Sequence, residues 1–514
     1  MNSRWFRGSL LGLVAAGAGL AVSEAASGYL HQRVSPVVAL AEEIIRLTPG
    51  PVIEFVISIV GQNDKPLLIT MTLLGVAVVS ALVGVLVLRF TLIAQLIFVG
   101  LGFVLAWAAG DRLTSSTTTY VPTVLGVVTT LLVLALLTPL ANRAGEESDV
   151  SATSTWEAED RAHSRRQFLQ WSGAVAAGAV VVGVVGLALE RGRAAVEAAR
   201  RSLRLHATDP LTPKGVSVGV AGIVPWKTSQ DRFYRIDTAL VVPQILPKDW
   251  SLRIHGMVDR ELVLSYDELR IRGLTEAWLT LCCVSNDVGG GLISNAWFSG
   301  VKVSTLLEEA GVQSGADAVL STSDDGWTAG TPLGALTDDR NAMLAIAMNG
   351  EPLTPEHGFP VRMVVPGLYG YVSGTKWIRE IEVTRFDDFS AFWTQRGWSA
   401  QGPVKTESRI DVPGDGSNVA AGQVAVGGVA WAQHTGIAKV EVRVDDGAWG
   451  EAQLGTDPTV DSWRQWAYAW DATAGDHQLQ VRATDNSGYT QTEQRVGVVP
   501  NGATGWHTID VSVS

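Results

Sequence analysis

The stretch TLCCVSN at residues 280–286 contains the two cysteines of this chain of 514 residues. Its apolar start and polar end predict a buried strand over 278–286 that leads into a turn. Neighbouring side chains of a strand point to opposite faces, so Cys282 and Cys283 are not expected to bind one ion together. Two adjacent cysteines in so long a chain also exclude a disulfide framework. One cysteine is therefore a candidate for chemistry, and the other for a small buried side chain.

Four short blocks follow this stretch at defined positions. They read NGEPL at 349–353, EHGFPVR at 356–362, VPG at 365–367 and GTKW at 374–377. In this order the five blocks resemble the T-L-x-C-x-x-N, N-G-E-x-L, H-G-F-P-x-R, V-P-G and K-W motifs of the sulfite oxidase family. Members of that family hold a molybdenum–pyranopterin cofactor. The resemblance covers roughly residues 230–514.

The resemblance implies that Cys283 is the protein ligand of the molybdenum. Cys283 matches the cysteine of the family motif, whereas Cys282 falls on a variable position. A high-valent molybdenum centre prefers soft sulfur donors, and one thiolate would add to the two sulfurs of the pterin dithiolene. The bound metal would also keep that cysteine deprotonated.

The resemblance further implies that several segments bind the organic part of the cofactor. Arg362 would offer a pair of N–H donors to the phosphate. Arg235 would also reach the active site, although alone it would be interpreted as a surface charge. Asp325 precedes a glycine, so a simple Asp-Gly turn is the alternative there. The implied cofactor-binding residues are Phe233, Tyr234, Arg235, Asn286, Asp325, His357, Arg362, Gly374, Thr375 and Lys376.

Three positions depart from the members of the family that oxidise sulfite. Asp287 and Val288 stand where those members carry arginines, and Ile346 stands where they carry a tyrosine. An anion in place of a cation beside a dianionic substrate costs several kcal/mol at an effective dielectric near about 20. Arg235 and Arg396 remain as candidate cations. We therefore expect the cofactor to be kept and sulfite to be a poor substrate.

Composition divides the chain into an apolar and a polar part. The first 190 residues are rich in Leu, Val, Ala and Gly, and the remainder is polar and rich in Trp. A net charge of −12 argues against a nucleic-acid partner, because no basic patch is available to neutralise phosphates.

The apolar part predicts a multi-pass membrane anchor. The positions of arginines predict a cytoplasmic N-terminus and a catalytic part on the extracytoplasmic side. A cleaved signal peptide ending near Ala26 is the alternative for the first span. The segment 37–61 carries charges and prolines and is predicted to be an interfacial helix pair. The five stretches long enough to span are 8–30, 67–89, 92–110, 121–141 and 168–190.

The fifth predicted span opens with SRRQFL at 164–169, which resembles the twin-arginine translocation consensus. Two arginines that anchor a helix at the cytoplasmic surface are the alternative. The twin-arginine route exports folded domains, and a molybdenum cofactor is inserted before export.

The sequence predicts no haem. His31 is the only histidine before His163, so the apolar part lacks the histidine pair of a b-type haem, and no C-x-x-C-H motif occurs. Electrons would therefore pass to or from a separate partner, either a cytochrome or a quinone-linked protein.

From about Thr406 the chain alternates apolar and polar residues in short runs with turn residues between them. This pattern predicts an immunoglobulin-like sandwich. The family resemblance implies a homodimer through this domain. Its tryptophans, Trp431, Trp449, Trp463, Trp466 and Trp470, are predicted to be core or interface residues.

The predicted fold is multidomain, with a helical membrane bundle, an α+β molybdopterin-binding domain and an all-β sandwich. The expected ranges are 1–190 for the anchor, 191–225 for a linker, 226–404 for the oxidoreductase domain and 405–514 for the sandwich. The predicted function is oxygen-atom transfer on a small S- or N-oxyanion or oxide. A non-catalytic membrane-bound scaffold or binding protein with the same fold is the alternative.

Overall fold

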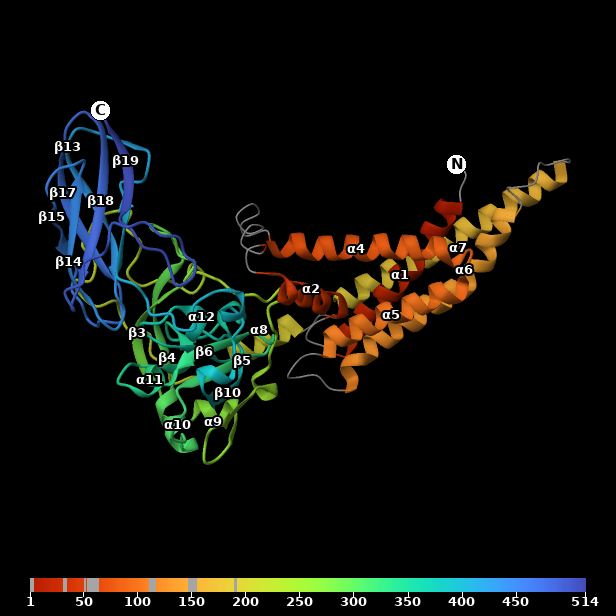
Figure 1. The fold of residues 1–514 in the computed structure, drawn as a ribbon, viewed down its shortest axis with the longest axis horizontal. Helices are drawn as coiled ribbons and strands as arrows, with labels where there is room; N and C mark the ends of the chain where they lie inside the picture. The colour runs from red at the N-terminus through yellow and green to blue at the C-terminus, as the bar shows by residue number, and fades with distance from the viewer. Residues whose placement is uncertain are drawn as a thin grey trace. The chain divides into compact units, whose positions relative to one another are not determined.

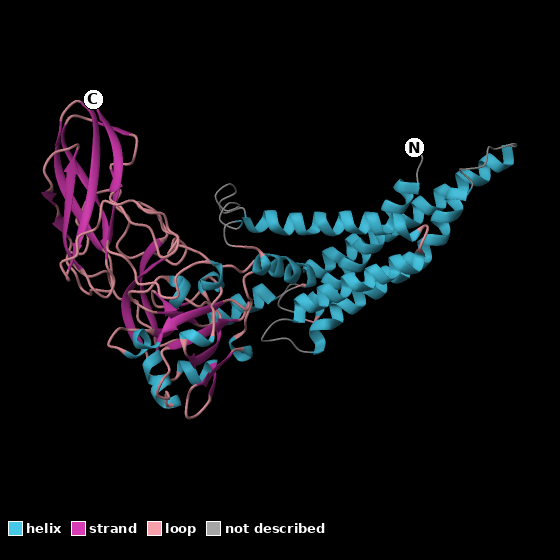
Figure 2. Ribbon diagram, in the orientation of Figure 1, coloured by secondary structure: helices cyan, strands magenta, loops and turns pink. Residues whose placement is uncertain are grey.

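The computed structural model describes residues 4–30, 35–49, 52, 64–110, 117–146, 155–188 and 192–514. They form two compact units, Met1–Ala195 with Ala239–Gln244, and Val196–Thr238 with Ile245–Ser514. Figure 1 labels their elements, and Figure 2 shows that the strands belong to the second unit.

The first unit is a bundle of helices in which α1 packs against α4, α6 and α7. Apolar side chains such as Leu11, Leu134 and Phe168 form its core. A Cβ at Gly12 would lie 1.9 Å from the carbonyl oxygen of Ser80, so α1 and α4 approach through their backbones. The helices are α1 (Arg4–Tyr29), α2 (Pro36–Leu47), α4 (Asp64–Val87), α5 (Thr91–Gly110), η2 (Thr117–Tyr120), α6 (Val121–Glu146) and α7 (Thr155–Ala188).

Four of the predicted spans correspond to helices that are long and apolar enough to cross a membrane. The fifth, 168–190, lies in α7 up to Ala188, and among the described residues α7 is not one of these four helices. The first part of the segment 37–61 forms α2, and residues 53–63 lie outside the described residues. The four helical spans are Arg4–Tyr29, Leu67–Val87, Thr91–Gly110 and Thr117–Arg143.

The second unit contains an α+β region with two sheets. One sheet has the order β2-β1-β10-β5-β6, and the other has the order β3-β4-β7-β8 with β9 beside β7. Its strands are β1 (Ser251–Gly256), β2 (Leu262–Ser265), β3 (Thr275–Cys282), β4 (Ile293–Lys302), β5 (Ala318–Ser323), β6 (Thr328–Pro332), β7 (Met343–Met348), β8 (Glu351–Pro352), β9 (Arg362–Val364) and β10 (Ile378–Thr384).

Short helices connect these strands, so the predicted α+β class is confirmed for this region. They are α8 (Gly192–Ser202), η3 (Pro247–Asp249), α9 (Tyr266–Arg270), α10 (Val303–Ala310), α11 (Leu333–Thr337), η4 (Pro355–His357), α12 (Gly370–Ser373), η5 (Phe386–Asp388) and η6 (Thr394–Arg396).

The strand that leads to the cysteines is shorter than predicted. β3 ends at Cys282, whereas the sequence pattern predicted a strand over 278–286. The chain turns here because the amide of Asn286 donates to the carbonyl of Cys283 at 3.1 Å. The side-chain oxygen of Asn286 in turn accepts from the amide of Leu292 at 2.7 Å. Cys283 therefore lies in the first position of a loop and not within the strand.

The C-terminal part is a sandwich of two sheets with the orders β11-β13-β17-β16 and β12-β19-β18-β14-β15. Its core includes Val440, Trp466 and Leu479. Four of the five predicted core tryptophans are buried, whereas Trp449 is half-buried and packs its ring on Trp506. The strands are β11 (Glu407–Val412), β12 (Ser417–Val419), β13 (Gly422–Trp431), β14 (Ile437–Val444), β15 (Gly450–Glu451), β16 (Gln453–Leu454), β17 (Arg464–Ala472), β18 (Gly475–Asp485) and β19 (His507–Val513).

The sandwich holds strand β3 close to the cysteines. The amide of Thr280 donates to the carbonyl of Asp461 at 2.9 Å. The amide of Trp463 donates to the Thr280 hydroxyl at 2.8 Å, and the amide of Gln433's side chain donates to the Thr280 carbonyl at 3.1 Å. Loops of the sandwich thus bind a residue three positions before Cys283.

Candidate functional site

The two cysteines differ in their surroundings. Burial raises the pKa of the Cys283 thiol, while hydrogen bonds from Ser285 and the charge of Lys376 oppose this rise. Burial raises the pKa of Cys282 well above its usual range, and Cys283 and Glu407 raise it further. The Sγ atom of Cys282 donates to the carbonyl of Cys283 at 3.5 Å. Because Cys283 has more neighbours that stabilise a thiolate, its surroundings suit a metal ligand better.

Two buried cations, Arg362 and Lys376, belong to the predicted site. Arg362 is the last residue of the H-G-F-P-x-R block, and Lys376 follows the block in the chain. Arg362 begins β9, and burial lowers its pKa to about 10. Lys376 follows the short helix α12, and burial lowers its pKa to about 8. The Lys376 ammonium donates to Asp237 Oδ2 at 3.1 Å and to the carbonyl of Glu356 at 2.9 Å. Buried cations of this kind require anionic partners, and a phosphate would provide one.

Asp237 is a buried carboxylate that pairs with two cations of the site. It was not among the residues predicted from the sequence. Its Oδ2 atom accepts from Arg235 Nε at 2.9 Å as well as from Lys376, and its side chain is 4% exposed. The sequence did contain a pattern that indicates this pair. Arg235 and Asp237 are two positions apart in the extended FYRID segment, so their side chains lie on the same face of it.

His357 is neutral and presents an acceptor. Burial and the charges of Lys376 and Arg362 lower its pKa to about 4. Its Nε2 atom lies 2.7 Å from the carbonyl of Gln230. A carbonyl only accepts, so Nε2 carries the proton and Nδ1 is left with a lone pair. Nδ1 is buried and has no hydrogen-bond partner among the described residues.

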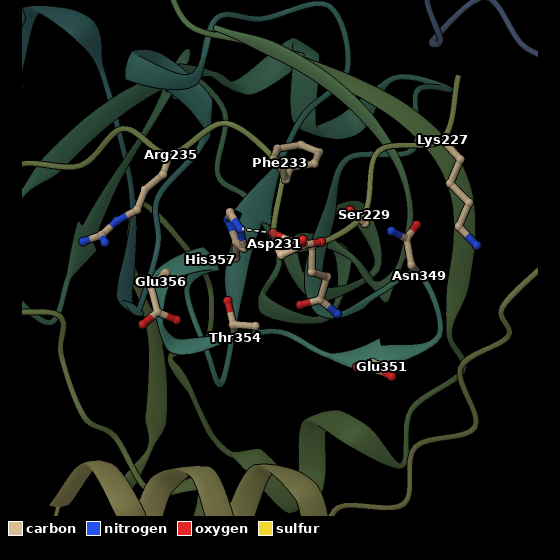
Figure 3. A pocket seen from close by; sticks show the side chains of 11 residues that line it. Lys227, Ser229, Asp231, Phe233, Arg235, Asn349, Glu351, Thr354, Glu356 and His357 are labelled. Atoms are coloured by element: carbon tan, nitrogen blue, oxygen red, sulfur yellow. Dashed lines mark hydrogen bonds between the residues drawn. The ribbon is translucent and has the colours of Figure 1, made fainter. Parts of the chain in front are cut away.

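A pocket of about 740 Å³ opens beside His357 (Figure 3). Its walls come from two segments, 227–235 and 349–357, so three of the predicted residues line it: Phe233, Arg235 and His357. The pocket carries charges of both signs. Its lining residues are Lys227, Ser229, Gln230, Asp231, Phe233, Arg235, Asn349, Glu351, Thr354, Glu356 and His357.

Phe233 and Tyr234 join the pocket to the cysteines. The buried ring of Phe233 packs edge-on against His357, with 5.6 Å between the ring centroids. The amide of Tyr234 donates to the hydroxyl of Ser294 at 3.1 Å. Burial raises the pKa of Tyr234 well above its usual range, and Cys283 raises it further. The Tyr234 hydroxyl therefore remains protonated and is a donor near the cysteines.

The remaining predicted residues have visible structural roles. Thr375 is fully buried, and its hydroxyl lies 2.7 Å from that of Ser321. A Cβ at Gly374 would lie 3.0 Å from the carbonyl oxygen of Gly370, so glycine allows a close approach of the backbone there. Asn286 uses its oxygen in the loop after Cys283, and its Nδ2 atom is buried without a hydrogen-bond partner among the described residues.

Asp325 lies in the β5–β6 turn, where its Oδ1 accepts from the amide of Trp327 at 3.1 Å. This is the Asp-Gly turn that the sequence offered as the alternative. The neighbouring carboxylate, Asp324, is buried and pairs with Arg379 Nε at 2.7 Å. A role of Asp325 toward the cofactor stays a prediction.

These side chains fit a phosphorylated pterin. Buried polar atoms of His357, Arg362 and Asn286 lack hydrogen-bond partners in the described part of the chain. The His357 acceptor suits an N–H of the pterin, and the Arg362 and Lys376 cations suit its phosphate.

The comparisons with known proteins agree with this arrangement. The family model for the oxidoreductase molybdopterin binding domain matches residues 239–393. "Uncharacterized oxidoreductase YuiH" of Bacillus subtilis is 37% identical over 153 residues, which are 30% of this chain and 74% of that protein. The chain belongs to the sulfite oxidase family. Family membership makes it a molybdopterin-binding oxidoreductase.

Two further comparisons cover more of the chain. Mitochondrial sulfite oxidase of Mus musculus is 29% identical over 330 residues, which cover 53% of this chain and 59% of that protein. The crystal structure of the sulfane dehydrogenase SoxCD from Paracoccus pantotrophus is similar at 23% identity and a TM-score of 0.49, over 60% of this chain and 88% of that one.

Two more family models match outside the cofactor region. A twin-arginine translocation signal matches residues 163–182, and a bacterial Ig domain matches residues 407–481. The predicted twin-arginine signal and immunoglobulin-like domain are therefore confirmed.

The first testable prediction concerns the two cysteines. Cys283→Ser should abolish activity and change the molybdenum–sulfur coordination, because it removes the protein thiolate. Cys282→Ser should change both little, because the Cys282 thiol is a buried donor to a carbonyl. Activity with an artificial redox dye and X-ray absorption at the molybdenum edge would measure the two effects. Loss of activity in Cys282→Ser alone would reverse the assignment.

The second prediction concerns the charge of Lys376 in cofactor-free protein. Its folded pKa is about 8, below the usual value of about 10.4. Between these pH values the unfolded chain binds one more proton, so this group makes stability rise with pH. We expect the free energy of unfolding of wild type to rise relative to that of Lys376→Met as the pH increases from about 8 to about 10.5. The relative gain should reach up to about 3 kcal/mol. Denaturant unfolding across that range would measure it, and a constant difference would contradict the buried charge.

Proposed function

We propose that the protein is a membrane-anchored oxidoreductase that transfers an oxygen atom to or from a small S- or N-oxide or oxyanion. The observation that carries the proposal is the convergence of Cys283, the buried cations Arg362 and Lys376, and neutral His357. When bound, the molybdenum cofactor supplies two-electron oxygen-atom transfer.

Each of these residues has a distinct role in the proposal. Cys283 holds the metal, while Arg362 and Lys376 bind the phosphate. His357 accepts a hydrogen bond from the pterin and, through Gln230, stays in one tautomer. Arg235 and Cys283 are the proposed catalytic residues, and the Tyr234 hydroxyl provides a donor next to them.

The charges near Cys283 favour a neutral or singly charged substrate. Asp287 is exposed in the loop after Cys283, and Ile346 is fully buried in β7. Arg235 donates to Asp237 Oδ2 at 2.9 Å and shares this carboxylate with Lys376. Arg396 stacks on the Phe392 ring, with its guanidinium carbon 3.7 Å from the centroid, and donates to the carbonyl of that residue. These cations are engaged by protein groups, so a sulfite dianion would gain little from them.

The twin-arginine match supports export of the folded catalytic part. We propose that the N-terminal helices anchor the chain as a multi-pass membrane protein with its N-terminus in the cytoplasm and its catalytic part outside. The domain boundaries at 190, 225 and 404 belong to this proposal. So do a separate cytochrome or quinone-linked electron partner and a homodimer through the sandwich.

A non-catalytic scaffold is the alternative function. It would not need Cys283, Arg362 and His357 together, and it predicts purified wild-type protein that is folded but contains no molybdenum. About one molybdenum per chain in the same preparation supports the enzyme.

The third prediction concerns sulfite. We expect kcat/KM for sulfite below about 10⁴ M⁻¹s⁻¹, the lower end of the ordinary enzymatic range. Asp287→Asn should raise the value for sulfite and leave that for a neutral sulfoxide unchanged, because only the dianion is repelled by the carboxylate. Steady-state kinetics with a dye as electron acceptor or donor would test both. A wild-type value above that limit would show that other cations complete the pocket.

The fourth prediction concerns export. Arg165→Lys combined with Arg166→Lys should leave the catalytic part on the cytoplasmic side, because the twin-arginine route requires this pair. Arg4→Lys combined with Arg7→Lys is the matched control and should not affect export. Protease accessibility of the catalytic part in spheroplasts would report the side. Equal accessibility in wild type and the first double variant would mean that the pair only anchors the helix.

A further inference from the structure

A second group of polar side chains lies at the joint between the α+β region and the sandwich. Asp338 and Asp339 follow helix α11, and His434 lies in the turn between β13 and β14. One ligand atom from each of the three residues lies within 4.8 Å of the others. His434 Nε2 and Asp339 Oδ1 are 3.8 Å apart. This distance is too long for a hydrogen bond, but it suits two atoms that bind one ion.

A buried carboxylate supports the other side of the His434 ring. Asp461 is 5% exposed, and its Oδ1 atom lies 3.4 Å from His434 Nδ1. This oxygen is buried and has no hydrogen-bond partner in the part of the chain that the structure describes. Histidines that bind metals usually donate their second ring N–H to a carboxylate, which fixes the ring orientation. Asp461 Oδ1 is the carboxylate oxygen beside His434 Nδ1 and is placed to take this role.

The electrostatics of the joint favour a cation. Asp338, Asp339 and Asp461 contribute three carboxylates, and Arg340 pairs with Asp338, with its Nε atom 2.9 Å from both Oδ1 and Oδ2. Arg340 also donates to the carbonyl of Pro366 at 2.8 Å, which fixes its position. A cation on the Nε2 side of His434 would stabilise all three carboxylates.

We propose that Asp338, Asp339 and His434 bind a divalent ion of the zinc class, with Asp461 as a positioning residue. Zinc accepts both imidazole nitrogen and carboxylate oxygen as ligands, whereas calcium and magnesium prefer oxygen ligands alone. Asp339 has 96% of its side chain exposed, so the ion can enter from solvent. This site is separate from the molybdenum site, and the inference does not depend on the proposed function.

The ion would strengthen the joint that holds β3. His434 and Asp461 belong to the sandwich, and Asp338 and Asp339 belong to the α+β region. The carbonyl of Asp461 accepts from the amide of Thr280, three residues before Cys283. An ion bound here would link both domains next to the strand that carries the cysteines, and it would raise the thermal midpoint of unfolding.

The fifth prediction tests this site in the molybdenum-loaded protein after removal of loosely bound metals with a chelator. Titration with ZnCl₂ by calorimetry should give one site per chain and a rise in the thermal midpoint. Co²⁺ in place of Zn²⁺ should give d–d absorption without a thiolate charge-transfer band, because neither cysteine is a ligand. No binding at about 100 μM Zn²⁺, or a thiolate band, would overturn the proposal.

Three variants locate the site. Asp339→Asn changes an exposed side chain, and His434→Asn suits the positive φ of 68° at that residue. Each should weaken zinc binding at least about tenfold, and Asp461→Asn should weaken it by about 10–100-fold, the range for residues that orient a ligand. His477→Asn is the control, because His477 contacts Asp445 at 2.9 Å and the carbonyl of Thr473 at 2.8 Å and none of the proposed ligands, and it should bind as wild type does. Wild-type affinity in both Asp339→Asn and His434→Asn would refute the site.

Discussion

The candidate cofactor site depends on the compensation of buried positive charge. Arg362 and Lys376 are both nearly enclosed, and burial lowers the pKa of each. Asp237 is the carboxylate that pairs with Lys376, and it also pairs with Arg235. One carboxylate does not neutralise three cations, so the site favours an additional anion. A phosphate bound beside Arg362 and Lys376 would pair with these two charges. Together with burial, the same charges lower the pKa of His357 and so keep its ring neutral.

The sandwich domain takes part in the geometry of the site. Thr280 uses its amide, its hydroxyl and its carbonyl in hydrogen bonds to sandwich residues, so β3 is fixed from one side. Arg409 of β11 donates to the carbonyl of Gly290 at 2.7 Å and so fixes the loop that follows Cys283. The cysteine therefore lies between two segments that the sandwich holds. A change in the joint between the two domains would therefore reach Cys283 without any contact to it.

The sequence predicted the parts of the fold that depend on local pattern. The alternation after Thr406 and the helical apolar stretches correspond to the observed sandwich and bundle, and the motif order identified the family. It did not predict where β3 ends, because the turn depends on Asn286 bonding to Leu292 six residues later. It also missed Asp237 and Gln230, whose partners Lys376 and His357 lie more than a hundred residues away. Trp449 shows the same limit, since its position depends on Trp506.

The proposed substrate preference depends in part on the charge of the loop after Cys283. Arg409, a cation of the sandwich that contacts this loop, is buried and forms an ion pair with Asp411 at 2.6 Å. Its charge is therefore compensated by that carboxylate. The exposed carboxylate of Asp287 remains on the same loop, and it helps to raise the pKa of buried Glu407 to about 8, after burial itself. A loop that makes a neighbouring carboxyl harder to ionise also disfavours a dianion, because both effects arise from the same negative potential.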